Sequence, residues 1–213
     1  MSKSFTRILF TIGLIALVGS LLAKPKSENE IEYMIKIFLD GIQKAFGKLN
    51  QAQVESITQI VWSFQIHGDR DLRKLTYILA TAWHESKFLL VKEKRGTPGT
   101  DLYARQEAYW PSGYFGRGFV QLTHMINYEK LGRALNINLV KNPDLALDRR
   151  TASDIIVIGM MKGLFTGKSL YDYITPGFQD YVNARRVVNG QDRAELIAGY
   201  TNSIIFNLEY PIA

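Results

Sequence analysis

The segment LRKLTYILATAWHESKF, residues 72–88, decides how the middle of this chain folds. Its apolar residues recur at helical spacing and predict a helix that begins at Asp69 or Asp71 and buries one face. The apolar face ends at His84 and Glu85, just before Phe88. Partial burial disfavours the charged form of a carboxyl group, and a protonated carboxyl group can act as a general acid. Glu85 is therefore a candidate catalytic acid, and the alternative is an ordinary acidic residue at a solvated helix end.

Similar apolar periods on both sides of this segment predict a mainly α-helical domain over residues 31–213. Gly47 and Gly68 are expected to end the first two helices, and Asn50 to cap the second. Turns are expected at Asn142-Pro143-Asp144 and Thr175-Pro176-Gly177. The remaining helical patterns fall at roughly 31–46, 51–67, 121–135, 150–164, 178–188 and 191–207.

A long loop region interrupts the helices between Lys92 and Phe119. Glycine and proline break any long helix there, and six aromatic residues crowd into the same stretch. A loop of this length inside a compact domain is often functional. We expect it to be ordered, with a small β-hairpin as an option.

The N-terminus has the layout of an export signal or a membrane anchor. Lys3 and Arg7 precede an apolar run over residues 8–23, and residues 24–30 then form a polar linker. We expect residues 1–23 to be a signal peptide or an inner-membrane anchor. The domain would then face the periplasm and cell wall, or be associated with a virion. The net charge of +6 favours an anionic partner, such as a cell wall, a membrane surface or a nucleic acid, and by itself selects none of these.

Several classes of site are excluded by the residues themselves. The chain has no cysteine, which removes disulfides and thiolate sites. Phe88 stands four positions after His84, where a zinc-protease motif needs histidine. No Gly-x-Ser-x-Gly elbow and no phosphate-binding glycine loop with its lysine are present. We therefore expect no metal, no organic cofactor and no nucleic-acid partner.

One further segment resembles a known family. Gly113-Tyr114-Phe115-Gly116-Arg117-Gly118-Phe119-Val120-Gln121-Leu122-Thr123-His124, followed by Asn127-Tyr128, is similar to the signature of glycoside hydrolase family 19. That family includes plant-type chitinases and many phage endolysins. Its His-Glu pair is matched by His84-Glu85 and its Asn-Gly pair by Asn189-Gly190. The resemblance implies a lysozyme-like α-helical fold.

The resemblance also implies roles for individual residues. Glu85 falls at the general acid, and Glu93 near the second glutamate, with Glu107 as the alternative. Thr123 matches the residue that holds the attacking water. Residues implied in substrate binding or in shaping the cleft are His84, Glu107, Tyr114, Arg117, Gln121, Asn127 and Asn189.

The resulting expectation is a peptidoglycan-degrading glycosidase of the muramidase or endolysin kind, which cuts between N-acetylated amino sugars during cell-wall degradation or host lysis. Three alternatives stay open. Glu85-Ser86-Lys87-Phe88 also resembles lytic transglycosylases, which use one glutamate. The substrate could instead be chitin. The chain could also be a non-catalytic wall-binding or virion structural protein.

Overall fold

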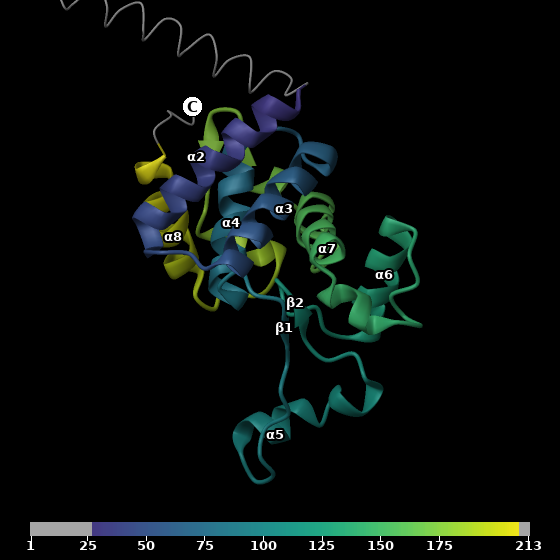
Figure 1. Ribbon diagram of the computed structural model, residues 1–213. Coiled ribbons are helices and arrows are strands. Elements are labelled where there is room, and N and C mark those ends of the chain that lie inside the picture. The colour runs from purple at the N-terminus through teal and green to yellow at the C-terminus, as the bar shows by residue number, and fades with distance from the viewer. Residues whose placement is uncertain (1–26, 209–213) are drawn as a thin grey trace, which may run out of the picture.

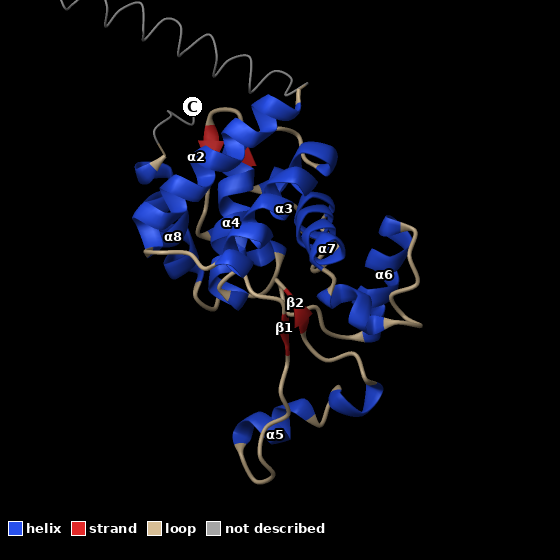
Figure 2. Ribbon diagram, viewed as in Figure 1, coloured by secondary structure: helices blue, strands red, loops and turns tan. Residues whose placement is uncertain are grey.

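The computed structural model describes residues 27–208, in which seven α-helices form most of the structure (Figures 1 and 2). The mainly helical prediction is therefore confirmed for this part of the chain. The helices are α2 (Glu28–Phe46), α3 (Gln51–His67), α4 (Leu72–Ser86), α5 (Asp101–Gln106), α6 (Met125–Leu135), α7 (Arg149–Lys162) and α8 (Ala194–Asn207).

The helix starts are fixed by side-chain caps. The Asn50 side chain accepts a hydrogen bond from the backbone N–H of Gln53, whose own side chain caps Asn50 in return. Asp71 caps α4 through the N–H of Arg73. Ser27 caps α2 in the same way, so the helix begins at Glu28. Residues 28–30, which the sequence assigned to a polar linker, are therefore the first turn of a helix.

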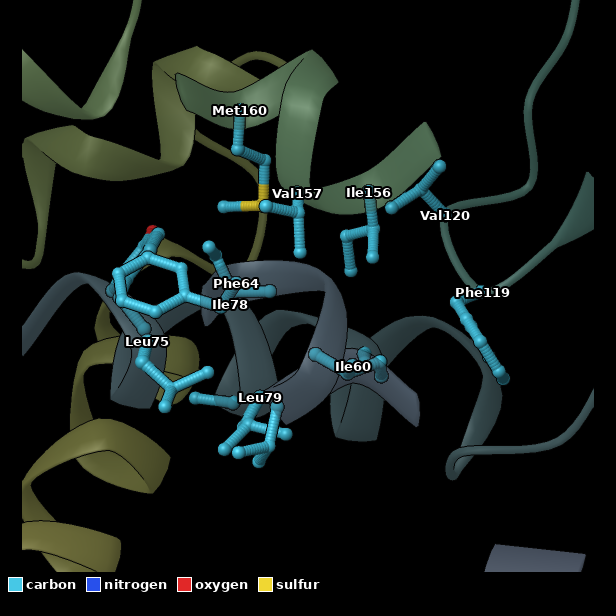
Figure 3. Close-up of a cluster of buried hydrophobic side chains, with 14 of the residues drawn as sticks. Ile60, Phe64, Leu75, Ile78, Leu79, Phe119, Val120, Ile156, Val157 and Met160 are labelled. Atoms are coloured by element: carbon cyan, nitrogen blue, oxygen red, sulfur yellow. The ribbon is translucent and has the colours of Figure 1, made fainter. Parts of the chain in front are cut away.

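The core is shared by α2, α3, α4, α7 and α8, and Figure 3 shows the part where a pair of loop residues joins α3, α4 and α7. Phe119 and Val120 insert from the loop before α6 and are 1 % and 7 % exposed. Burying side chains of this size stabilises the fold by about 1.5–3 kcal/mol each. The two residues thus anchor the neighbouring segment, residues 121–124, to the body of the protein. The labelled partners in Figure 3 are Ile60, Phe64, Leu75, Ile78, Leu79, Ile156, Val157 and Met160.

The loop region forms a projecting arm, which we define as residues 93–116. Its base is a two-stranded antiparallel ladder of β1 (Val91–Lys92) and β2 (Arg117–Gly118). The arm itself carries the short helix α5 and the 3-10 turn Trp110–Ser112, and extends away from the helical body (Figure 1). The ordered loop and the small hairpin are thus present, and α5 is an addition to what the sequence predicts.

Two predicted helices differ from the structure. The helix expected over 121–135 begins only at Met125, because Gln121 and His124 have positive φ angles of 51° and 70°. The helix expected over 178–188 is replaced by strand β4 (Phe178–Gln179) and a 3-10 turn at Asn183–Val187. Gly177, at φ 80°, closes a turn that pairs β4 with β3 (Ile174–Thr175). Two further 3-10 turns span Pro143–Leu147 and Leu170–Asp172.

The predicted signal or anchor, residues 1–23, lies outside the described residues. Between residues 27 and 208, no helix combines the length and the apolar character that crossing a bilayer requires.

Candidate functional site

Glu85 lies in the last turn of α4, where the chain leaves the helix abruptly. Lys87 and Phe88 follow with positive φ angles of 53° and 60°, and Phe88 is fully buried. The Glu85 side chain is 18 % exposed, and its Oε1 lies 2.6 Å from Nη1 of Arg185. Arg185 itself is 3 % exposed and also donates from Nε to the backbone oxygen of Asp192. The candidate acid is thus held on one side by a buried guanidinium.

Glu85 opens on a groove of about 260 Å³. Four other predicted residues, Gln121, Thr123, Asn127 and Asn189, line the same groove. The structure therefore brings together residues that are up to about a hundred positions apart in the sequence. The remaining lining residues are Val120, Leu122, His124, Phe165 and Val188.

Hydrogen bonds fix the polar wall of this groove. Gln121 Nε2 donates to the backbone oxygens of Val91 and Gly118, both at 3.0 Å. Thr123 Oγ1 donates to the oxygen of Gln121 at 2.8 Å, and Asn127 Nδ2 donates to the oxygen of Thr123 at 2.9 Å. These bonds use most of the side-chain hydrogens. The wall therefore offers a ligand chiefly oxygen acceptors, which suit the hydroxyl and amide hydrogens of sugars.

Glu93 stands at the base of the arm and accepts three hydrogen bonds. Tyr109 Oη donates to Oε1 at 2.6 Å, Gln106 Nε2 donates to Oε1 at 2.9 Å, and the Gly116 N–H donates to Oε2 at 2.7 Å. Partial burial opposes ionisation, but the three bonds outweigh it and hold the pKa of Glu93 below its ordinary value. Glu93 is thus a carboxylate at neutral pH.

Gly116 connects Glu93 to the groove. A Cβ atom at this position would lie 2.7 Å from Oε1 of Gln121 and 3.1 Å from Oε2 of Glu93. The two oxygens therefore converge on the bare Cα of Gly116, and Gln121 is itself a lining residue of the groove. Glu93 does not itself line the groove, but its Oε2 lies next to Gln121, which does.

Like Glu93, the remaining predicted residues are not part of the groove lining. Glu107 is 51 % exposed at the end of α5 and pairs with Arg95. Tyr114 donates from Oη to the backbone oxygen of Val140 and packs on the core. His84 lies near Tyr200, and burial together with nearby cations lowers its pKa, against the opposing effect of Glu85.

Arg117 also serves the architecture of the loop. It is 5 % exposed, and its Nε lies 2.7 Å from Oδ1 of Asp144. Its Nη1 donates to the backbone oxygens of Gly113 and Phe115. Arg117 thus ties the end of the arm to the body.

Arg185 is the site residue that sequence reasoning missed. The available indication was its position four residues before Asn189 of the Asn-Gly motif. Among the described residues, no group of three or more histidine, aspartate or glutamate side chains is placed to hold a metal ion.

Part of this chain is similar in sequence to known chitinases. Residues 80–179 match the family model for glycoside hydrolase family 19, described as chitinase class I. Chitinase 1 of Oryza sativa subsp. japonica is 32 % identical over 43 % of this chain and 34 % of its own length. An endochitinase of Solanum tuberosum is 43 % identical over 24 % of this chain and 16 % of its own length. The matched segments thus span about a third or less of these relatives.

Two solved structures share the fold. Chitinase C from Streptomyces griseus HUT6037 has a TM-score of 0.55 at 20 % identity, over 83 % of this chain and 78 % of that one. A bacterial family 19 chitinase has a TM-score of 0.51 at 18 % identity, over 83 % of this chain and 99 % of that one. The fold is therefore chitinase-like and consistent with the lysozyme-like architecture. Through residues 80–179 the protein is similar to glycoside hydrolase family 19, which confirms the resemblance that its motifs predict.

Proposed function

We propose that the protein is a glycoside hydrolase that cleaves peptidoglycan between N-acetylated amino sugars. The observation that carries the proposal is the groove in which a mostly buried Glu85 faces the amide and hydroxyl side chains of Gln121, Thr123 and Asn127. The family 19 match over the same residues supports glycosidic bond cleavage.

In the proposed reaction, Glu85 takes up a proton before the chemical step and donates it to the leaving glycosidic oxygen. Glu93 accepts a proton from water as that water attacks the sugar carbon, and Thr123 positions the water. Inverting glycosidases use two carboxyl groups about 6.5–9.5 Å apart in this way. Once Glu85 has lost its proton, Arg185 at 2.6 Å stabilises the carboxylate that remains. No cofactor takes part in this scheme.

Two neighbouring activities have support of their own. Chitin is the alternative substrate, because the named relatives are chitinases. The net charge of +6 favours an anionic wall polymer over neutral chitin. A lytic transglycosylase would need Glu85 alone, whereas Glu93 beside Gln121 supplies a second carboxylate and favours hydrolysis.

The location proposed for the protein follows from its N-terminus. We infer that residues 1–23 deliver the domain across the inner membrane or tether it there, so that it reaches the wall during host lysis or wall remodelling. Sequencing the N-terminus of the mature protein from the membrane and soluble fractions tests this. A chain that stays in the cytoplasm with Met1 intact would refute it.

Digestion of purified murein and of chitin, analysed by mass spectrometry, tests the activity. The wild-type chain should release reducing ends from murein, and Glu85→Gln should abolish that release while keeping the fold. Glu107→Gln is the matched control, because that carboxylate is exposed and pairs with Arg95 rather than lying beside Gln121, and it should retain activity. Anhydro ends would indicate a transglycosylase, and cleavage of chitin alone would indicate a chitinase. No cleavage of either polymer would leave only a wall-binding protein.

A further inference from the structure

Two residues of the arm, Gln106 and Tyr109, donate hydrogen bonds to the carboxylate of Glu93 at its base. Gln106, which is fully buried, accepts a hydrogen bond from the Gly96 N–H and donates to both the Lys94 oxygen and Glu93. Tyr109 adds the shortest of the bonds to Glu93, and its ring packs edge-on against His124 with the centroids 5.5 Å apart. His124 lines the groove. Gln106 and Tyr109 thus contribute both to the fold of the arm and to the hydrogen bonds that hold Glu93.

We propose that Gln106 and Tyr109 are positioning residues that select which oxygen of Glu93 takes part in catalysis. This rests on the proposed role of Glu93 as the carboxylate that activates water. Both side chains donate to Oε1, so the two lone pairs of that oxygen are occupied. Oε2 accepts only the Gly116 N–H, which leaves one lone pair for a water molecule.

The free lone pair belongs to the oxygen next to Gln121, which is a lining residue of the groove. Oε2, not Oε1, is the Glu93 oxygen that approaches the bare Cα of Gly116, where it converges with Oε1 of Gln121. A water molecule that donates one hydrogen to Oε2 of Glu93 would have Oε1 of Gln121 as an acceptor for its second hydrogen. Gln106 and Tyr109, which we call the clamp, therefore fix the direction from which Glu93 takes a proton. They also keep Glu93 ionised, as a general base must be.

The cationic side chains nearest in the sequence to Glu93 and Gly116 pair with other carboxylates, so the hydrogen-bond donors are what favours the ionised form of Glu93. Arg95 is engaged with Glu107, while Lys92 and Arg117 both pair with Asp144. The groups that face or sense Glu93 are Tyr109 and Gln106 from the arm, Gly116 before β2, Gln121 from the following loop and Tyr128 from α6.

Tyr109→Phe tests the clamp, because it removes the 2.6 Å bond and keeps the ring against His124. Carbon-13 NMR of glutamate-labelled full-length protein should show Glu93 titrating at higher pH than in wild type, with Glu93→Gln identifying the resonance. On murein, the acidic limb of kcat should move to higher pH by the same amount while KM stays constant. At pH values well below both pKa values kcat should fall on the order of tenfold, which is equivalent to a shift of one pKa unit or about 1.4 kcal/mol. Gln106→Met should act in the same direction and serves if Tyr109→Phe alters the fold.

Tyr103→Phe is the matched control on the same arm. It also removes one phenolic hydroxyl, and it keeps both the ring that stacks on Arg95 and the three donors of Glu93. A Glu93 titration in Tyr109→Phe that equals the control would overturn the clamp. A shifted titration with an unchanged kcat profile would overturn its role in catalysis. If wild type cuts no glycan, the proposed function fails, and the clamp is then judged by the titration alone.

Discussion

Replacing Arg185 with methionine removes the buried partner of Glu85 while keeping much of the side-chain volume. Removing one member of a buried ion pair typically costs about 3–5 kcal/mol, because the other charge stays behind without compensation. Arg185 is 3 % exposed and Glu85 is 18 % exposed, so some solvent still reaches the carboxylate. We therefore expect the lower end, about 3 kcal/mol. For a domain of this size that loss lowers Tm by about 6–12 °C.

The assay is a double-mutant cycle on the free energy of unfolding, measured by urea titration. It uses wild type, Arg185→Met, Glu85→Gln and the double variant. The two changes should couple by at least about 1 kcal/mol, since each removes the same contact. Arg186→Met is the control, because this neighbouring arginine is exposed, and it should change stability by no more than about 0.5 kcal/mol. Additivity of the two site changes, or an equal loss in Arg186→Met, would refute the importance of the pair.

Three further predictions concern backbone strain and pH. Gly118→Ala should lower Tm in a thermal melt, because Gly118 has φ 75° and a Cβ there would lie 2.6 Å from the backbone oxygen of Ala146; an unchanged Tm would contradict this contact. His84 should titrate below its ordinary pKa in proton NMR, because burial disfavours its charged form, so acidification below about pH 6.5 should lower the free energy of unfolding less in His84→Gln than in wild type. Glu93 has a lowered pKa, so its stabilising effect should be full above about pH 4.5 and disappear as the pH falls through the folded-state value. Urea titrations of wild type and Glu93→Gln should accordingly converge at low pH, and curves that stay parallel would contradict the prediction.

The sequence predicts most of the helical body, and the reason is periodicity. Apolar residues at helical spacing and capping residues such as Asn50 define α2, α3, α4, α7 and α8 within a few positions. The prediction was wrong at residues 121–124 and 178–188, where local backbone geometry overrides the pattern. Gln121 and His124 adopt positive φ angles that non-glycine residues rarely take, and neither residue type indicates such a conformation in the sequence.

The candidate site is predictable only in part, because its members come from distant segments. The family motif identified Glu85 and the Gln121–Asn127 wall that faces it. The pairing of Glu85 with Arg185 spans 100 positions, and no local pattern indicates it. The three hydrogen-bond donors to Glu93 could not be predicted for a similar reason, because Gln106, Tyr109 and Gly116 reach Glu93 only in the folded arm.

The left-handed residues around the groove have a consequence for how the protein responds to heat. Lys87, Phe88, Gln121 and His124 all hold positive φ without being glycine, and each such residue costs on the order of 1 kcal/mol. Contacts with neighbouring residues must offset that cost, so the backbone of the groove wall at Gln121 and His124, and of the turn after Glu85, is strained. On warming, these segments should loosen first, and amide exchange at residues 87–88 and 121–124 should quicken while α3 and α7 still hold together. The proposed activity would then be lost at a lower temperature than the fold. Substitutions that relieve the backbone strain would raise the temperature at which the groove loosens but would fix its shape less firmly.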